Sequence, residues 1–258
     1  MKICMLTYQL GKDWTLDEII QVSNKLKLDG VEFRAEAGHK HGVELETSAD
    51  ERSEIKKKMA DAGLITAGLG TSVRFEYPEP EERKKQVEHT KEFVQLAKDI
   101  GAERVRVFGN CFPPGRPKED LVGWITEGLL EISEFAADHA VEVDLEMHGD
   151  LWYWEPCVKI MENVDKTFIG LVENCDPREV VGGSVKPSYE RVAPYIRHVH
   201  MHNLEDVRFP YRELFEMLYL DDYQGFLSME ASGSSDPERI VALYKLYLDE
   251  VIANIAAL

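Results

Sequence analysis

Short apolar runs alternate with longer amphipathic segments along the whole chain. Eight runs have the composition of strands, at 3–7, 30–34, 64–70, 104–108, 141–148, 168–174, 197–202 and 225–230. Helix-like segments with an apolar stripe follow them, at about 15–28, 49–62, 80–100, 120–140, 153–164, 188–196, 211–220 and from 237 onward. The pairs Thr15–Glu18 and Ser48–Glu51 have the spacing of helix capping boxes. Asp236 and Pro237 are typical first residues of a helix.

Eight strand–helix pairs without a linker predict a single-domain (β/α)₈ TIM barrel over residues 1–258, and the length is usual for this fold. Several of the strands alternate polar and apolar residues, although parallel strands covered by helices are normally apolar on both faces. An antiparallel sheet with one wet face would also alternate, but the intervening helices favour the barrel. The barrel interior should then hold polar residues: Glu32, Arg34, Arg104, Arg106, Asp144, Glu146, His148, His198, His200 and His202.

The last four strands each end near a residue that can bind a metal ion. These residues are Glu146, Asn174, His200 and Glu230, with spacings of 28, 26 and 30 residues, about one strand–helix unit each. A barrel gathers the carboxyl ends of its strands at one face, where such side chains would meet. Two carboxylates, an imidazole and an amide oxygen suit one divalent ion: Mn²⁺, Mg²⁺, Co²⁺ or Zn²⁺.

Net charge, cysteine spacing and the length of apolar runs limit the possible partners and the cellular compartment. The formal charge of −18 argues against nucleic acid and anionic membrane as partners, because both require a basic surface. The four cysteines are widely spaced and do not resemble a disulfide framework. The first residues hold too short an apolar run for a signal peptide, and no segment is apolar enough to cross a bilayer. A cytoplasmic protein is the expectation.

Five stretches carry a resemblance to a known family: LEMHGD (145–150), GLVENCDP (170–177), HVHMHN (198–203), GFLSMEAS (225–232) and DPERI (236–240). In their order and spacing they resemble the xylose-isomerase-like TIM-barrel superfamily, the sugar phosphate isomerase/epimerase group. The resemblance implies that Glu146, Asn174, His200 and Glu230 hold one divalent metal ion. It also implies that Glu146 and Glu230 are the acid/base pair. Asn174 departs from the commoner Asp, and Asp176 is an alternative ligand.

The implied activity is a metal-dependent isomerase or epimerase of carbohydrate metabolism that acts on a sugar or sugar phosphate. The two glutamates would move a proton beside a carbonyl, through a metal-stabilised enediolate. His148 and His202 are candidates to contact substrate hydroxyls, or they make ordinary interior hydrogen bonds. Arg106 and Arg34 could bind a phosphate or carboxylate, or form internal ion pairs with Glu32. The Trp14 ring could stack on a sugar or pack between helices.

Other functions stay open at this point. Proton abstraction followed by loss of a β-hydroxyl would make the protein a dehydratase, a lyase acting on a keto-polyol. A non-catalytic sugar-binding barrel is a second alternative, because Asn174 weakens the metal site. An apurinic endonuclease fits least, since that branch needs extra histidines where this chain has Pro177 and no Asp-x-His after His200. Relatives are often oligomers, so a homo-oligomer is possible.

Overall fold

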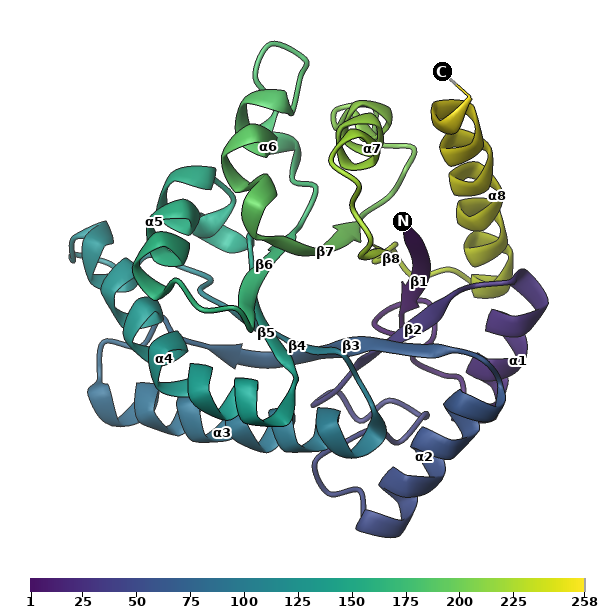
Figure 1. The fold of residues 1–258 in the computed structure, drawn as a ribbon, viewed down its shortest axis with the longest axis horizontal. Coiled ribbons are helices and arrows are strands. Elements are labelled where there is room, and N and C mark those ends of the chain that lie inside the picture. The colour runs from purple at the N-terminus through teal and green to yellow at the C-terminus, as the bar shows by residue number, and fades with distance from the viewer. Residues whose placement is uncertain (258) are drawn as a thin grey trace.

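Eight parallel strands close into a barrel in the order in which they occur along the chain (Figure 1). The structure is a computed structural model and describes residues 1–257. The strands are β1 Lys2–Leu6, β2 Gly30–Arg34, β3 Ile65–Arg74, β4 Arg104–Phe108, β5 Glu142–Glu146, β6 Ile169–Glu173, β7 Ile196–Met201 and β8 Phe226–Met229. The helices are α1 Leu16–Leu26, α2 Ala49–Asp61, α3 Pro80–Ile100, α4 Lys118–His139, α5 Trp154–Val164, α6 Lys186–Val192, α7 Tyr211–Leu220 and α8 Pro237–Ala256. The predicted single-domain TIM barrel is confirmed.

The predicted elements are all present, and most boundaries agree within two or three residues. Both capping boxes form, and Asp236 caps α8 by accepting a hydrogen bond from the backbone N–H of Arg239. Strand β3 extends four residues beyond its predicted end, because Val73 continues the buried face. Helix α6 ends at Val192, before its predicted end, and the 3₁₀ turn η3 (Ala193–Tyr195) follows it.

The strand register determines which side chains reach the barrel interior. Glu146 on β5 pairs with Val172 on β6, which pairs with His198 on β7, and His200 pairs with Ser228 on β8. Because side chains alternate faces along a strand, the interior face continues to Asn174 and Glu230 just beyond the ends of β6 and β8. The helices cover the outside of the barrel, and the main apolar core lies between them and the strands.

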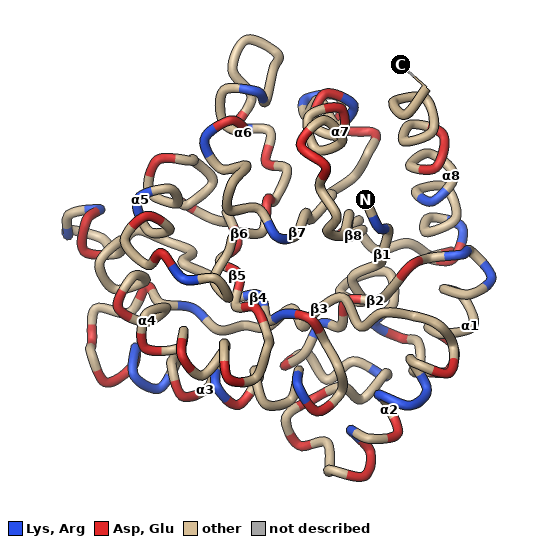
Figure 2. The backbone as a smooth tube through the Cα atoms, in the orientation of Figure 1, with Lys and Arg blue, Asp and Glu red and all other residues tan. Residues whose placement is uncertain are grey.

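Charged residues are distributed over the outer helices, with Lys and Arg interspersed among Asp and Glu (Figure 2). The sequence carries 48 acidic against 30 basic residues, so the acidic excess is spread over the surface. Among residues 1–257, no helix is both long and apolar enough to cross a membrane.

Candidate metal centre

Three side chains from three strands meet at the carboxyl end of the barrel. Glu146 ends β5, His200 lies near the end of β7, and Glu230 follows β8. Their potential ligand atoms all lie within 4.8 Å of one another. His200 Nδ1 is 3.2 Å from Glu146 Oε1 and 3.3 Å from Glu230 Oε2. Two of the four predicted residues, Glu146 and Glu230, therefore contact the imidazole of a third, His200.

Asn174, the fourth residue of the quartet, is buried directly after β6. Its Oδ1 atom has no hydrogen-bond partner. The alternative residue, Asp176, lies beyond a turn in which Cys175 adopts a left-handed φ of 49°. The Asp176 carboxylate caps the 3₁₀ turn η2 (Pro177–Glu179) and accepts hydrogen bonds from the Arg178 guanidinium. Of the two, Asn174 is the one whose oxygen is free to bind a ligand.

The residues of this site fit a divalent cation on chemical grounds. Asn174 Oδ1 is a buried acceptor without a hydrogen-bond donor, and so is Glu230 Oε2, which has only the ion-pair contact with His200 Nδ1 at 3.3 Å. Folded proteins rarely leave such atoms unsatisfied, and each costs free energy when it is. An oxygen-binding cation would satisfy both, and the charge of the Glu146 and Glu230 carboxylates would balance its own. The sequence-predicted set Glu146, Asn174, His200 and Glu230 is therefore suitable for a metal ion.

The charges around Glu146 keep that carboxylate ionised. Burial alone would raise the pKa of Glu146, but the positive charges of Arg106 and His200 outweigh it and lower the pKa to about 2. For His200, burial opposes protonation, while Glu32, Glu146 and Glu230 together raise its pKa well above the usual value. The cluster thus combines an ionised buried carboxylate with an imidazole surrounded by acceptors.

Arg106 binds a protein carboxylate rather than standing free for a substrate anion. Its Nε lies 3.0 Å from Glu146 Oε2, and its Nη1 donates to the backbone oxygen of Thr71 at 2.7 Å. Arg34 is half-buried and donates to the backbone oxygen of Gly70 and to Ser72 Oγ. The expected ion pairs of these two arginines with Glu32 do not form, because Glu32 is engaged elsewhere.

Glu32 accepts hydrogen bonds from three interior side chains. His198 Nε2 is 2.8 Å away, Ser228 Oγ is 2.7 Å away, and His200 Nε2 is 3.1 Å from each carboxylate oxygen. Although burial would raise the pKa of Glu32, the two histidines lower it well below its usual range. The alternation of polar and apolar residues along β2 predicts Glu32 inside the barrel, but it predicts no contact of Glu32 with a candidate metal ligand. The alternation in GVEFR was the only available signal.

The remaining candidate substrate contacts lie around the barrel mouth at different depths. His148 is half-buried, and its Nδ1 is 2.8 Å from Asn110 Oδ1. Its ring packs against Phe108, with centroids 4.9 Å apart. His202 follows β7, and its backbone oxygen accepts a hydrogen bond from Tyr244. Trp14 lines a rim pocket with residues of α1 and the start of α8, and this pocket shares no residue with the metal cluster.

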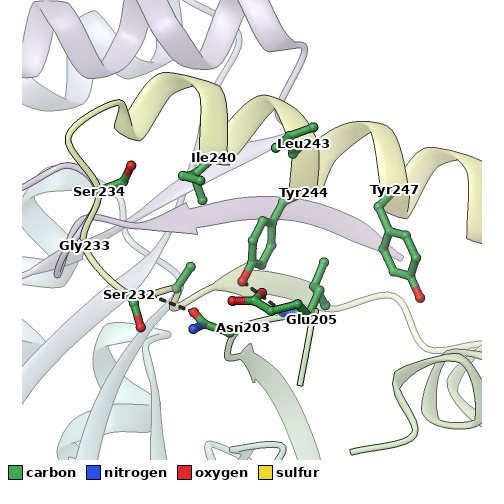
Figure 3. Close-up of a pocket in the computed structure, with 11 residues that line it drawn as sticks. Asn203, Glu205, Ser232, Gly233, Ser234, Ile240, Leu243, Tyr244 and Tyr247 are labelled. Carbon is green, nitrogen blue, oxygen red and sulfur yellow. Dashed lines mark hydrogen bonds between the residues drawn. The ribbon is translucent and has the colours of Figure 1, made fainter. Parts of the chain in front are cut away.

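A second hollow, which the sequence did not predict, lies between helix α8 and the loops after β7 and β8 (Figure 3). Its volume is about 510 Å³, and Ile240, Leu243, Tyr244 and Tyr247 of α8 form its apolar side. On the opposite side, Asn203 Oδ1 accepts a hydrogen bond from the backbone N–H of Ser232. This bond ties together the loops that follow His200 and Glu230.

Comparison with known proteins places this fold in a family. The family described as xylose isomerase-like TIM barrel matches residues 20–247. An L-ribulose 3-epimerase superposes with a TM-score of 0.82 at 15% identity, covering 99% of this chain and 96% of the other. A D-psicose 3-epimerase with D-tagatose, from Clostridium cellulolyticum H10, gives 0.80 at 14% identity, covering 98% and 99%.

A third structure, of IOLI protein with a binding zinc atom, gives a TM-score of 0.74 at 14% identity, covering 99% of this chain and 96% of the other. At these identities the likeness concerns the fold. By sequence, no curated protein gives a significant match. The family match, which extends over most of the barrel, shows that the chain belongs to the xylose isomerase-like TIM barrel family.

Proposed function

We propose that this protein is a sugar isomerase or epimerase that requires one divalent metal ion, Mn²⁺, Mg²⁺, Co²⁺ or Zn²⁺, bound by Glu146, Asn174, His200 and Glu230. The observation that carries the proposal is the convergence of ligand atoms from Glu146, His200 and Glu230 within 4.8 Å. The unpartnered Asn174 oxygen supports it. So do the similar structures, which include an L-ribulose 3-epimerase and a protein with bound zinc.

Glu146 and Glu230 have different surroundings, which suggest different roles in proton transfer. The Glu230 side chain is 16% exposed, whereas that of Glu146 is 2% exposed and is held between Arg106 and His200. Glu230 is therefore the carboxylate that a substrate reaches more easily, and we assign to it removal of the proton beside the carbonyl. Glu230 can return the proton it removed to the adjacent carbon, or Glu146 can supply one after taking it up from solvent while Glu230 releases its own. A bound divalent ion would supply electrophilic stabilisation of the developing enediolate charge.

The contacts of Arg106 and Arg34 indicate whether the substrate carries a phosphate group. Arg106 is paired with Glu146, and Arg34 is bonded to a backbone oxygen and to Ser72. Neither guanidinium is free to hold a phosphate, so we favour a small unphosphorylated sugar. His148 and His202, half-buried at the mouth, are the candidates to contact its hydroxyl groups.

Metal content is the first test. Wild type and His200→Ala are equilibrated with each of the four ions, freed of unbound metal and analysed by plasma mass spectrometry. We expect about one ion per chain in wild type and loss of that ion in the variant. Wild type without metal under all four conditions would refute the proposed site.

Proton transfer is the second test, and it uses Glu146→Gln and Glu230→Gln in a screen of ketoses and aldoses in D₂O. We expect both variants to fold and to lose turnover. Wild type should incorporate solvent deuterium at the carbon next to the carbonyl. Full activity in both variants would refute the acid/base assignment, and an unsaturated product would identify a dehydratase instead.

A further inference from the structure

Glu32 is too deeply buried to touch a substrate, yet it contacts the central residue of the candidate metal site. Only 1% of its surface is exposed, and His198 and His200, which surround it, are fully buried. It extends from β2 past the neighbouring strand β1 to donors on β7 and β8. Any effect of Glu32 on function must therefore act through one of its partners.

The two nitrogens of His200 face different groups. Nε2 lies 3.1 Å from both oxygens of Glu32, while Nδ1 faces Glu146 Oε1 and Glu230 Oε2. An ionised carboxylate only accepts hydrogen bonds, so the nitrogen that faces Glu32 must carry a proton. Without a metal ion, the same argument places a proton on Nδ1, which faces Glu146 and Glu230. A metal ion bound there would release that proton, and the lone pair of the neutral imidazole then belongs to Nδ1.

Glu32 is itself held in place. Ser228 Oγ donates to its Oε2 at 2.7 Å, and His198 Nε2 lies 2.8 Å from the same oxygen. A carboxylate fixed by donors from two strands offers His200 a rigid acceptor. Carboxylates that bind the outer nitrogen of a metal-binding histidine orient the ring and set its tautomer.

We propose that Glu32 is a positioning residue that fixes the His200 ring with Nε2 protonated and its Nδ1 lone pair directed to the metal. The inference rests on the proposed function, since it needs His200 to be a ligand. Cys4, Glu32 and His198 also lie within 4.8 Å of one another and could be read as a second metal site. The three hydrogen-bond donors around Glu32 already engage that carboxylate, which favours the positioning role.

The test compares Glu32→Gln with a matched control, Asp144→Asn. Asp144 is another fully buried carboxylate of the barrel interior, but it bonds to Arg104 and has no described contact with His200. The affinity for Mn²⁺ is measured by titration calorimetry without substrate, after circular dichroism confirms that each variant is folded. We expect Mn²⁺ to bind about 10- to 100-fold more weakly to Glu32→Gln and within about twofold of wild type to Asp144→Asn.

Nitrogen-15 NMR of labelled histidine reads the tautomer of His200 in the wild-type protein itself. In zinc-loaded wild type, the His200 signals, identified by their loss in His200→Asn, should show a proton on Nε2 and metal on Nδ1. Metal on Nε2 would overturn the proposal, as would unchanged Mn²⁺ affinity in Glu32→Gln.

The outcomes separate this inference from the proposed function. Wild type that binds no metal overturns the site and the role of Glu32 together. Wild type that binds one ion, with equal affinity in Glu32→Gln, overturns the role of Glu32 alone. Two ions in wild type, one of them lost in Cys4→Ala, would make Glu32 a ligand and so overturn the positioning role.

Discussion

We expect the ion pair between Arg106 and Glu146 to contribute measurably to stability. Both side chains are almost fully buried, and Nε and Oε2 are 3.0 Å apart. Burial opposes ionisation of Glu146, but Arg106 and His200 lower its pKa from 4.5 to about 2. A difference of this size between unfolded and folded states corresponds to about 3 kcal/mol of stability at neutral pH. Because the folded-state pKa is the lower one, this stability is present above about pH 4.5 and is lost as the pH falls towards 2.

Replacing Arg106 by Gln removes the charge and leaves a buried carboxylate without its main partner. We expect the free energy of unfolding of the metal-free protein to fall by about 3–5 kcal/mol at pH 7. Part of this loss, about 1 kcal/mol, belongs to the hydrogen bond with the backbone oxygen of Thr71 and does not depend on pH. The rest should shrink as the pH falls below about 4.5. The assay is urea unfolding of both proteins with a chelator, at pH 7, 5, 4 and 3.

The control variant is Arg106→Lys, which keeps a positive charge near Glu146 without the guanidinium geometry. It should retain much of the pH dependence of stability, while losing the pH-independent stabilisation from the hydrogen bond with Thr71. If the stability difference between wild type and Arg106→Gln is the same at pH 7 and pH 3, the reasoning is refuted. Arg106 would then stabilise the barrel through Thr71 and packing against Phe108, rather than through the charge of Glu146.

Three further substitutions test other parts of the site. Asn174→Asp adds a carboxylate to the cluster, so calorimetry should show at least about tenfold tighter Mn²⁺ binding, and urea unfolding a less stable metal-free protein. Gly149→Ala places a Cβ 2.4 Å from the backbone oxygen of Asn110 at a φ of 66°; thermal unfolding should show a loss of about 1–3 kcal/mol. Burial raises the pKa of Glu173 to about 7 and that of its neighbour Glu179 well above normal. Wild type should therefore lose stability relative to Glu179→Gln as the pH rises from about 4.5 through 7, which urea unfolding across that range would measure.

The sequence predicted the architecture and the faces of the strands well, because both follow from local geometry. Alternation along VEVDLEMH and RHVHMH places Glu146 and His200 in the interior whatever their partners are. The partners themselves depend on the register between strands and on the closure of the barrel. Glu32 was expected to pair with an arginine but bonds instead to His198, His200 and Ser228 on the far side of β1. No local pattern in the sequence encodes contacts between residues 166 to 196 positions apart.

The loops were less predictable for a related reason. Strand β6 ends at Glu173, and the left-handed conformation of Cys175 turns the chain so that Asp176 caps η2. The sequence favoured Asn174 as the ligand and kept Asp176 as an alternative, because it could not show where the strand stops. The different roles of the two residues follow from the turn at Cys175, which also brings Asp176 within reach of Arg178.

Asp144, on the same strand as Glu146, shows how a buried carboxylate of this barrel ionises in different surroundings. Asp144 and Glu146 are two residues apart, on the same face and almost fully buried. Burial, with the nearby charge of Glu142, raises the pKa of Asp144 to about 7 even though Arg104 lies beside it. Under the same burial Glu146 stays ionised, with Arg106 and His200 lowering its pKa to about 2. An ionised carboxylate is thus not a general property of this barrel interior. It occurs at Glu146 and Glu32, the two buried carboxylates that contact His200.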